Sequence, residues 1–348
     1  QNDSSYSLFS LDEPTNAAEI QQESETRIRV SRYFDRDSHP SLRSGPARVI
    51  VRASHPSMFG IREINVEATF DVEVLLDPPR LSPLSKFHYI NHGGSESVVY
   101  RTSANSAESG VFVGDRFFPG YQFPAVDGNP VDDLRFALFA LSYDQELDTP
   151  ITLYARDRAG NETRSTFDYR VFPSEFHRSN LAIGEDFLRR VVPAIAARAP
   201  ELADENVNTT TDVTELLDLY LFINGELRRQ NNSTISAIAG NTAEHRLWEE
   251  PFRQLENSQV ESRFADHRVY SHQGREIDQQ VHLGFDLAST TNAAIHASNT
   301  GRIVFANYLG IYGNCIIIDH GMGLQSLYAH LSSIDVSVGE EVKRNDPI

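Results

Sequence analysis

Short runs of alternating polar and apolar residues fill the chain between residues 47 and 172. Residues 48–53 and 64–76 are two such runs, and clusters of Pro, Gly, Asn and Asp separate them from the runs that follow. A period of two places every second side chain on the same face of a strand. Several short strands at this spacing are typical of an antiparallel sandwich. The pattern therefore predicts a β-sandwich domain over residues 47–172.

A tight turn near the end of this region adds to the prediction. Gly160 and Asn161 lie between two strand-like runs. Both residue types tolerate the backbone conformations of tight turns, so the pair predicts a hairpin. The segment 155–161 also resembles the terminal hairpin of bacterial immunoglobulin-like domains, which implies an immunoglobulin-like fold for 47–172. Asp157 has no series of carboxylate partners nearby, so we interpret it as a turn residue rather than a calcium ligand.

The segments on either side of 47–172 have different patterns. Residues 1–46 are polar and rich in Ser, Asp, Glu and Gln, which indicates a polar arm or linker. Residues 173–258 change to a helical period and predict a small helical linker domain. Within it, Asp212 and Glu215 have the spacing of a capping box at a helix start. Pro193 is expected to stop or kink an earlier helix.

Charge limits the classes of partner. The chain of 348 residues carries 49 acidic and 31 basic residues, a net charge of −18. A nucleic-acid binder needs a basic surface that displaces counterions from phosphates, so we exclude nucleic acid as a partner. The same excess of acidic residues argues against an anionic membrane surface as the main partner. No run of 18 or more apolar residues is present, so no membrane-spanning helix is predicted.

Two further features of the sequence, its single cysteine and its first residue, concern the cellular compartment of the protein. Cys315 is alone, so it cannot form an internal disulfide. It lies in the apolar run 315–318, which predicts a buried strand and a structural thiol. The chain begins with Gln1 rather than Met, which leaves open a removed export signal or a membrane tether outside this sequence.

Histidine and aspartate recur near the C-terminal end at a spacing that suits a metal. His282 and Asp286 are four residues apart, with Gly284 midway between them. Zinc takes histidine nitrogen and carboxylate oxygen at about 2.0–2.2 Å, and a catalytic zinc keeps one position for water. Four residues of a straight strand span about 13 Å, so the chain must bend between the two side chains. A bulge or turn at Gly284 would allow this bend.

Residues 259–348 resemble the lysostaphin-type (LytM-like) zinc metallopeptidases, which cut peptide cross-links in bacterial cell walls. The resemblance is carried by the His282-to-Asp286 motif and by further motifs at the expected intervals. These are Ala297 with Gly301, Tyr312 with Gly313 and Asn314, Asp319 with His320 and Gly321, Tyr328 with His330 and Leu331, and Val336 with Gly339. It implies an antiparallel-β peptidase domain. The expected fold is therefore a mainly β, multidomain chain.

The resemblance also implies a role for each histidine. His282 and Asp286 would supply two of the three protein ligands of a Zn²⁺ ion. His330 would not bind the metal but would be catalytic, as a base for the attacking water or a hydrogen-bond donor to the tetrahedral intermediate. His320 and His296 are interpreted as structural, His320 as a turn residue.

One part of the family pattern is not found in this sequence. The family completes its site with a His-x-His pair, which would supply the third ligand and a second catalytic histidine, and we expect this pair beyond Ile348. The peptidase domain is therefore expected to be incomplete here, the chain to be a piece of a longer protein, and this piece alone to be inactive. Asn345 replaces the usual glycine in a predicted turn, a change that asparagine tolerates.

The resemblance implies an exported zinc endopeptidase that acts in the periplasm or cell envelope. It would cleave peptide cross-links of peptidoglycan by metal-activated water, with the peptide stems as its partner. Two alternatives belong to other classes. The first is a non-catalytic relative that regulates other cell-wall hydrolases or binds the wall. The second is a structural or adhesive surface protein in which the sandwich domain carries the function.

Overall fold

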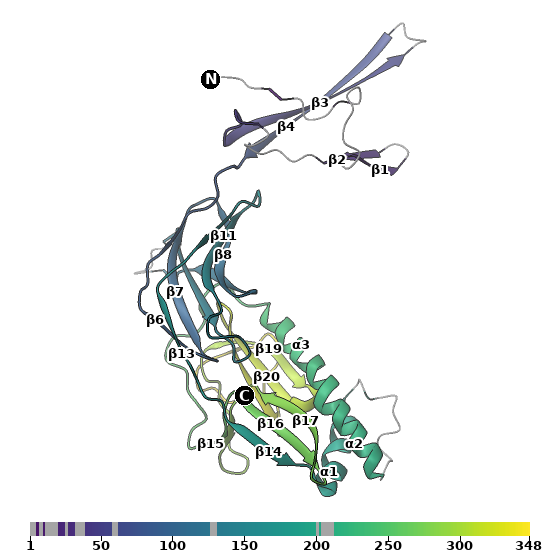
Figure 1. The fold of residues 1–348 in the computed structure, drawn as a ribbon, viewed down its shortest axis with the longest axis vertical. Coiled ribbons are helices and arrows are strands. Elements are labelled where there is room, and N and C mark those ends of the chain that lie inside the picture. The colour runs from purple at the N-terminus through teal and green to yellow at the C-terminus, as the bar shows by residue number, and fades with distance from the viewer. Residues whose placement is uncertain are drawn as a thin grey trace. The chain divides into compact units, whose positions relative to one another are not determined.

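A computed structural model gives the conformation of most of the chain. It describes residues 5–6, 10, 20–24, 27–31, 39–57, 62–125, 131–199, 202 and 212–348. The described chain forms two compact units. The first comprises the described residues up to Arg80 with 105–107 and 155–163, and the second comprises 81–104, 108–154 and 164–348. Strands predominate in both (Figure 1), which confirms the predicted mainly β, multidomain class.

The first unit contains two hairpins. Their strands are β1 (Ile20–Ser24), β2 (Arg27–Val30), β3 (Gly45–Ser57) and β4 (Arg62–Val74). Much of the predicted polar arm, 1–46, lies outside the described residues. Among the described strands, β3 and β4 pair only with each other, so the first strands of the predicted sandwich form a sheet of their own. The boundaries predicted at residues 47, 172 and 258 stay predictions.

A larger sheet of seven strands has the order β12-β11-β8-β9-β10-β7-β5, and most of its residues belong to the second unit. Its strands are β5 (Leu81–Pro83), β7 (Ser95–Thr102), β8 (Ser106–Val113), β9 (Arg116–Gln122), β10 (Leu134–Ala140), β11 (Ile151–Asp157) and β12 (Glu162–Ser165). β6 (His88–Asn91) pairs in parallel with β13 (Tyr169–Phe172). A buried core that includes Ile90, Tyr100 and Phe139 joins the two sheets. The immunoglobulin-like assignment stays a prediction.

The predicted hairpin at Gly160 and Asn161 is confirmed. It joins β11 to β12, and Gly160 has a φ of 90° that favours glycine. The Asp157 side chain organises the turn, because its Oδ1 accepts from the backbone N–H groups of Ala159 and Asn161, both at 2.9 Å. These bonds account for Asp157 as a turn residue.

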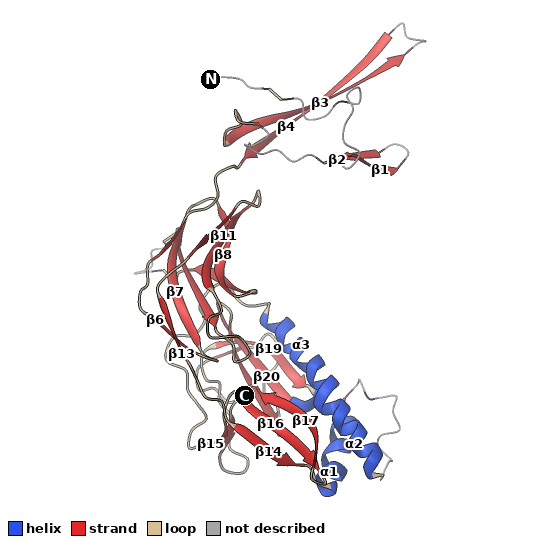
Figure 2. Ribbon diagram, in the orientation of Figure 1, coloured by secondary structure: helices blue, strands red, loops and turns tan. Residues whose placement is uncertain are grey.

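Three helices lie together beside the C-terminal strands (Figure 2). They are α1 (Glu185–Ala196), α2 (Val213–Phe222) and α3 (Arg228–Ala239), and a short π-helical segment, Ile223–Leu227, joins the last two. Asp212 caps α2 as predicted, because its Oδ1 accepts from the N–H groups of Thr214 and Glu215 at 2.7 and 3.3 Å.

Of the two effects predicted for Pro193, a stop or a kink, the stop is wrong, because α1 continues to Ala196. A proline ring removes one backbone hydrogen bond. The burial of Leu188, Val192 and Ala196 on one face of α1 stabilises the helix on both sides of Pro193.

The C-terminal strands form three small sheets. The first has the order β14-β16-β17, the second pairs β15 with β18, and the third has the order β21-β20-β19-β22. Their bounds are β14 (Arg178–Ala182), β15 (Gln259–Ser262), β16 (Asp266–His272), β17 (Arg275–His282), β18 (Asp286–Ala288), β19 (Gly301–Tyr308), β20 (Asn314–Gly321), β21 (Leu324–Leu331) and β22 (Glu341–Val342). All pair antiparallel except β14 with β16. β14 comes from the predicted linker 173–258, so that region contributes a strand to the C-terminal sheets.

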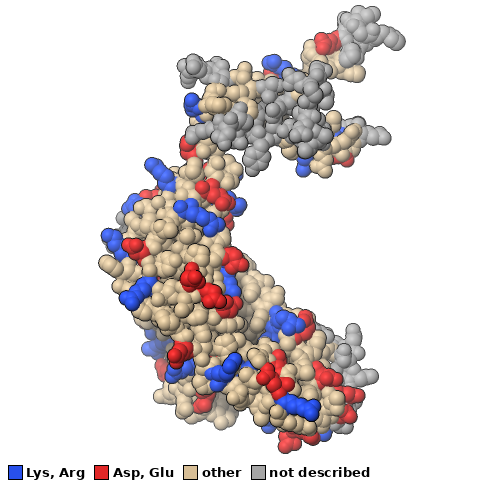
Figure 3. Space-filling view, viewed as in Figure 1, with Lys and Arg blue, Asp and Glu red and all other residues tan. Residues whose placement is uncertain are grey.

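Acidic and basic side chains are interspersed over the face of the second unit that Figure 3 shows. Among the described residues, none of the helices is long and apolar enough to cross a membrane. The apolar residues of α3 instead pack inward, where Ile235 and Ile238 contact the buried Cys315 and Ile317 of β20.

Candidate metal centre

His282 and Asp286 lie next to each other in the structure. His282 is the last residue of β17 and Asp286 is the first residue of β18. The chain bends at Gly284 between them, and His282 Nε2 is 3.2 Å from Asp286 Oδ1. The predicted bend is therefore present, but Gly284 does not have a positive φ. A Cβ at Gly284 would lie 3.8 Å from His282 Nε2, which is an ordinary van der Waals contact.

The hydrogen bonds of His282 assign its tautomer. Its Nδ1 is 3.2 Å from the carbonyl oxygen of Arg263 and 3.2 Å from the hydroxyl of Ser262. A carbonyl oxygen only accepts, so Nδ1 carries the proton and donates it. In the neutral ring, Nε2 is then a bare acceptor that faces an oxygen of Asp286. Two acceptors at this separation repel each other unless a proton or a cation lies between them.

The geometry of this pair fits a zinc ion. Donor atoms on a tetrahedral zinc, at about 2.0–2.1 Å from the metal, are about 3.3 Å apart. The 3.2 Å between Nε2 and Oδ1 agrees with that edge. A ligating histidine usually donates its other ring N–H to a carbonyl or carboxylate, as Nδ1 of His282 does. The described residues contain no group of three or more His, Cys, Asp or Glu side chains that could hold a metal. His282 and Asp286 would be two of the three protein ligands expected from the sequence.

Arg268 holds the second oxygen of Asp286. Its Nη2 donates to Asp286 Oδ2 at 2.8 Å and to the Ser262 hydroxyl at 2.8 Å. Strand pairing brings these groups together, because Ser262 on β15 lies opposite Asp286 on β18. Burial alone would lower the pKa of Arg268, but the hydrogen bond and the charge of Asp286 raise it above the ordinary value. Arg268 is therefore a fixed cation beside the pair.

Asp266 lies behind Arg268 and is almost completely buried. Its carboxylate accepts from Ser179 Oγ at 2.9 and 2.8 Å, is 2.9 Å from His177 Nδ1, and lies 3.4 Å from Arg268 Nε. Burial alone would raise the pKa of Asp266, but these hydrogen bonds outweigh it and lower the pKa below the ordinary value. Asp266 is therefore an anion that faces Arg268. The sequence analysis missed both residues, and their only sequence signal is their i, i+2 spacing, which puts them on one face of a strand.

His330 lies on a different sheet from the pair. It is exposed near the end of β21, where the pairing with β20 shifts between Asn314 and Ile316. Ala329 and His330 stand there opposite Cys315 alone, which is a β-bulge, and His330 has a φ of 57°. Within the described part of the chain, no hydrogen bond or ion pair joins His330 to His282 or Asp286. The bulge turns His330 toward solvent.

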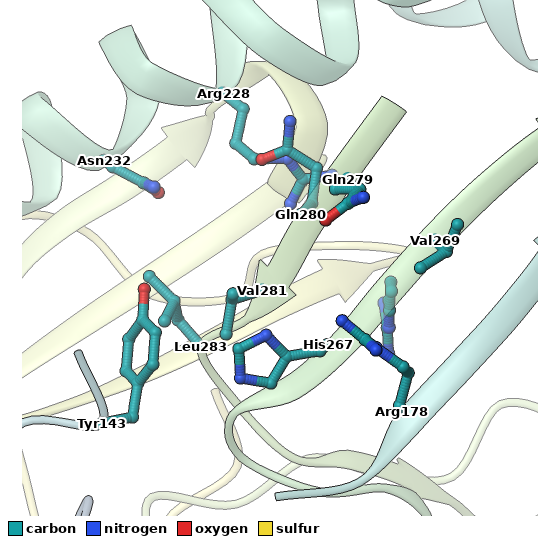
Figure 4. Close-up of a pocket in the computed structure, with 11 residues that line it drawn as sticks. Tyr143, Arg178, Arg228, Asn232, His267, Val269, Gln279, Gln280, Val281 and Leu283 are labelled. Atoms are coloured by element: carbon teal, nitrogen blue, oxygen red, sulfur yellow. The ribbon is translucent and has the colours of Figure 1, made fainter. Parts of the chain in front are cut away.

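Figure 4 shows a polar cavity of about 370 Å³ beside β17. Its wall is formed by Tyr143, Arg178, Arg228, Asn232, His267, Arg268, Val269, Gln279, Gln280, Val281 and Leu283. Val281 and Leu283 are the neighbours of His282 in the chain, so the cavity adjoins the strand that ends at the pair. Arginine, glutamine and asparagine donors in this wall can bind carbonyl and carboxylate groups.

His320, His296 and Cys315 were interpreted from the sequence as structural residues. His320 is fully buried and lies in β20, so its predicted place in a turn is wrong, although its contacts are structural. Its Nδ1 is 2.8 Å from the carbonyl of Thr300, and its Nε2 is 2.8 Å from Ser326 Oγ. Burial raises the pKa of the Cys315 thiol to about 12. His296 is exposed and forms an isolated β-bridge with Pro347.

Comparison with known proteins gives the family of the segment that contains the pair. The model of peptidase family M23 matches residues 280–348. This segment is an M23 domain. The match begins within β17 and includes His282, Asp286 and His330, whereas Asp266 and Arg268 precede it.

The relatives of the M23 domain include both a peptidase and an activator. The DD-carboxypeptidase/endopeptidase Mpg of Neisseria meningitidis is 38% identical over 60 residues, which are 17% of this chain and 14% of that protein. The murein hydrolase activator EnvC of Escherichia coli is 34% identical over 65 residues, which are 19% of this chain and 16% of that protein. The similarity thus spans less than a fifth of the length of either relative.

A solved structure described as a putative peptidase M23 from Pseudomonas aeruginosa aligns over more of the chain. The alignment covers 74% of this chain and 80% of that one, with 17% sequence identity and a TM-score of 0.41.

Proposed function

We propose that the protein is a zinc-dependent endopeptidase that cleaves peptide cross-links of bacterial peptidoglycan in the cell envelope. The observation that carries this proposal is the 3.2 Å approach of His282 Nε2 to Asp286 Oδ1, two acceptors at the edge length of a zinc tetrahedron. The M23 domain and its similarity to a DD-carboxypeptidase/endopeptidase support it. The proposed site needs a third protein ligand in addition to His282 and Asp286.

The proposal assigns a role to each residue around the metal site. Nε2 of His282 and Oδ1 of Asp286 hold the metal, and the Arg263 carbonyl keeps the proton on Nδ1 of His282. When bound, zinc lowers the pKa of water toward about 7 and polarises a scissile carbonyl. Arg268 neutralises the second carboxylate oxygen, so one oxygen of Asp286 remains for the metal.

In this proposal, His330 accepts or donates a proton during the reaction. It is exposed at a β-bulge near the end of β21. The imidazole can accept a proton from the attacking water or donate to the developing oxyanion. The polar cavity beside β17 supplies donors for the amide and carboxylate groups of a peptide stem.

A second candidate function is the activation of other wall hydrolases without cleavage. One observation favours it, the similarity of residues in the M23 domain to the murein hydrolase activator EnvC. An activator needs the β-scaffold but neither a metal nor a proton acceptor at His330. The presence of a bare acceptor pair favours the enzyme, because an activator has no need to hold Nε2 of His282 against a carboxylate.

Digestion of purified sacculi by the full-length protein tests the proposal. Mass spectrometry of the products should show hydrolysed cross-links, and His330→Ala should lower the rate by about 10²–10⁴-fold while zinc content stays unchanged. His296→Ala is a matched control, because His296 is also exposed on a strand-like segment. Wild-type rates in His330→Ala would remove His330 from the mechanism. A protein that releases nothing alone but accelerates an added wall hydrolase would be an activator.

A further inference from the structure

A continuous chain of polar contacts runs from the interior of the second unit to the metal pair. It begins at the buried carboxylate of Asp266, passes through the guanidinium of Arg268 and reaches Oδ2 of Asp286. Asp286 Oδ1 then faces His282 Nε2 at 3.2 Å. The Ser262 hydroxyl contacts three members of the chain, Asp266, Arg268 and His282. Asp266, Arg268 and Ser262 therefore hold the side chains of both His282 and Asp286.

Asp286 needs such support, because its side chain is 45% exposed at the start of a strand of three residues. A free carboxylate there could rotate or bind a metal through both oxygens. The Arg268 bond occupies Oδ2 and leaves Oδ1 directed at His282. A guanidinium has five donors in a planar fork, so one group can reach Asp266, Ser262 and Asp286 together.

Asp266 gives Arg268 its own fixed position. Its side chain is only 4% exposed, and an ion so deeply buried is costly unless it is paired and hydrogen-bonded. Ser179 on β14 and His177 just before it supply those bonds, although they lie 87 and 89 residues away in sequence. The parallel strand β14 lies next to β16 and puts Ser179 opposite Arg268. The strand that precedes the helices thus supports the pair.

We propose that Arg268 is a positioning residue for the metal-ligand pair and that buried Asp266 holds it in place. This inference rests on the proposed zinc site. Arg268 sets the orientation of Asp286 and, through Ser262, the orientation of His282. Arg268 is not a metal ligand, and its effect is on how tightly and with what geometry the metal is held.

Metal titration of the full-length protein tests this role without an activity assay. We expect Arg268→Gln to weaken Zn²⁺ binding, measured by competition with a chelator, by about 10–100-fold, the usual effect of losing a group that orients a ligand. Arg268→Lys keeps the charge but loses the fork, so it should recover only part of the affinity. Asp266→Asn should weaken binding in the same direction. Co²⁺ substitution should show an altered absorption spectrum in all three variants.

A matched control separates positioning from general destabilisation. Arg116 donates to Asp144 at 2.8 Å elsewhere in the second unit, so Arg116→Gln also removes an arginine–carboxylate pair. Its Zn²⁺ affinity and Co²⁺ spectrum should equal those of the parent. Parental affinity and spectrum in Arg268→Gln or, if that variant does not fold, in Arg268→Lys would overturn the inference while leaving the zinc site intact. A parent protein that binds no zinc would refute the proposed function and this inference together.

Discussion

His320 shows how burial decides the role of a histidine. Its Nδ1 donates to the Thr300 carbonyl, and its Nε2 lies 2.8 Å from the Ser326 hydroxyl. Burial lowers the pKa of His320 below its ordinary value, against smaller opposing effects of the Thr300 bond and Asp319. Protonation would place a charge in the core. His320 is therefore a neutral structural residue, unlike exposed His330.

This pKa shift predicts how stability depends on pH. The unfolded chain binds a proton at His320 near pH 6.5 and the folded chain binds it only at lower pH, so acid favours unfolding. The contribution of His320 is fully present above about pH 6.5 and decreases as the pH falls toward the folded-state value, by at most about 1.4 kcal/mol per pH unit. Chemical denaturation from pH 8 to 5 should show a flatter profile for His320→Asn than for the parent. Parallel profiles would show that His320 titrates alike in both states.

His282, Asp286 and His330 were proposed as site residues from local sequence motifs, and their roles stay predictions. His282 and Asp286 are four residues apart, and the bend that joins them follows from the length of a strand. The partners that hold them could not be read in the same way. Arg268 reaches Asp286 only through the pairing of β15 with β18, and Ser179 reaches Asp266 across 87 residues. Alternation shows which face a side chain takes but not which strand lies beside it.

At the scale of elements, Asp319 connects the end of β20 to the segment after α3. Its nearly buried carboxylate accepts from Thr242 Oγ1 at 2.6 Å, from the Ala243 N–H at 2.8 Å and from the Gly321 N–H at 3.0 Å. A second bond, from the Leu247 N–H to the His320 carbonyl at 2.8 Å, continues the connection. This segment is therefore held to the sheet by hydrogen bonds rather than by helix packing.

Removing that carboxylate should destabilise the second unit. Asp319→Ala leaves two backbone N–H groups without their acceptor, at a cost of about 1–3 kcal/mol for each group that stays buried. Asp319→Asn keeps one carbonyl acceptor and should lose less. Urea denaturation monitored by circular dichroism measures both variants. If Asp319→Ala and Asp319→Asn were equally stable, the carboxylate bonds would not hold this segment.

Element boundaries illustrate where local patterns are insufficient. The capping side chain of Asp212 and the turn at Gly160 follow from chemistry within a few residues, and both predictions are confirmed. Pro193 did not stop α1, because the buried face of the helix outweighs one lost hydrogen bond. The bulge at His330 depends on the shifted pairing of β21 with β20, which the sequence of β21 alone does not specify.

At the scale of the whole molecule, the chain forms several separate sheets. The pattern from residue 47 predicted strands correctly, but β3 and β4 form an independent sheet. One face of this hairpin carries Val49, Val51, Val66 and Phe70, and these side chains are at least partly exposed. Its other face carries ion pairs such as Arg48 with Asp71. Alternation alone could not distinguish a first sandwich strand from a separate amphipathic hairpin.

The central claim is that His282 and Asp286 bind a catalytic metal. Elemental analysis of the purified full-length protein and of its Asp286→Ala variant tests it most directly. We predict about one zinc per parent chain, as in other three-ligand catalytic sites, and loss of most of it in Asp286→Ala. Asp144→Ala, which removes a carboxylate paired with Arg116, should keep its zinc. Full stoichiometric zinc in Asp286→Ala would contradict the assignment, as would a parent protein that contains none.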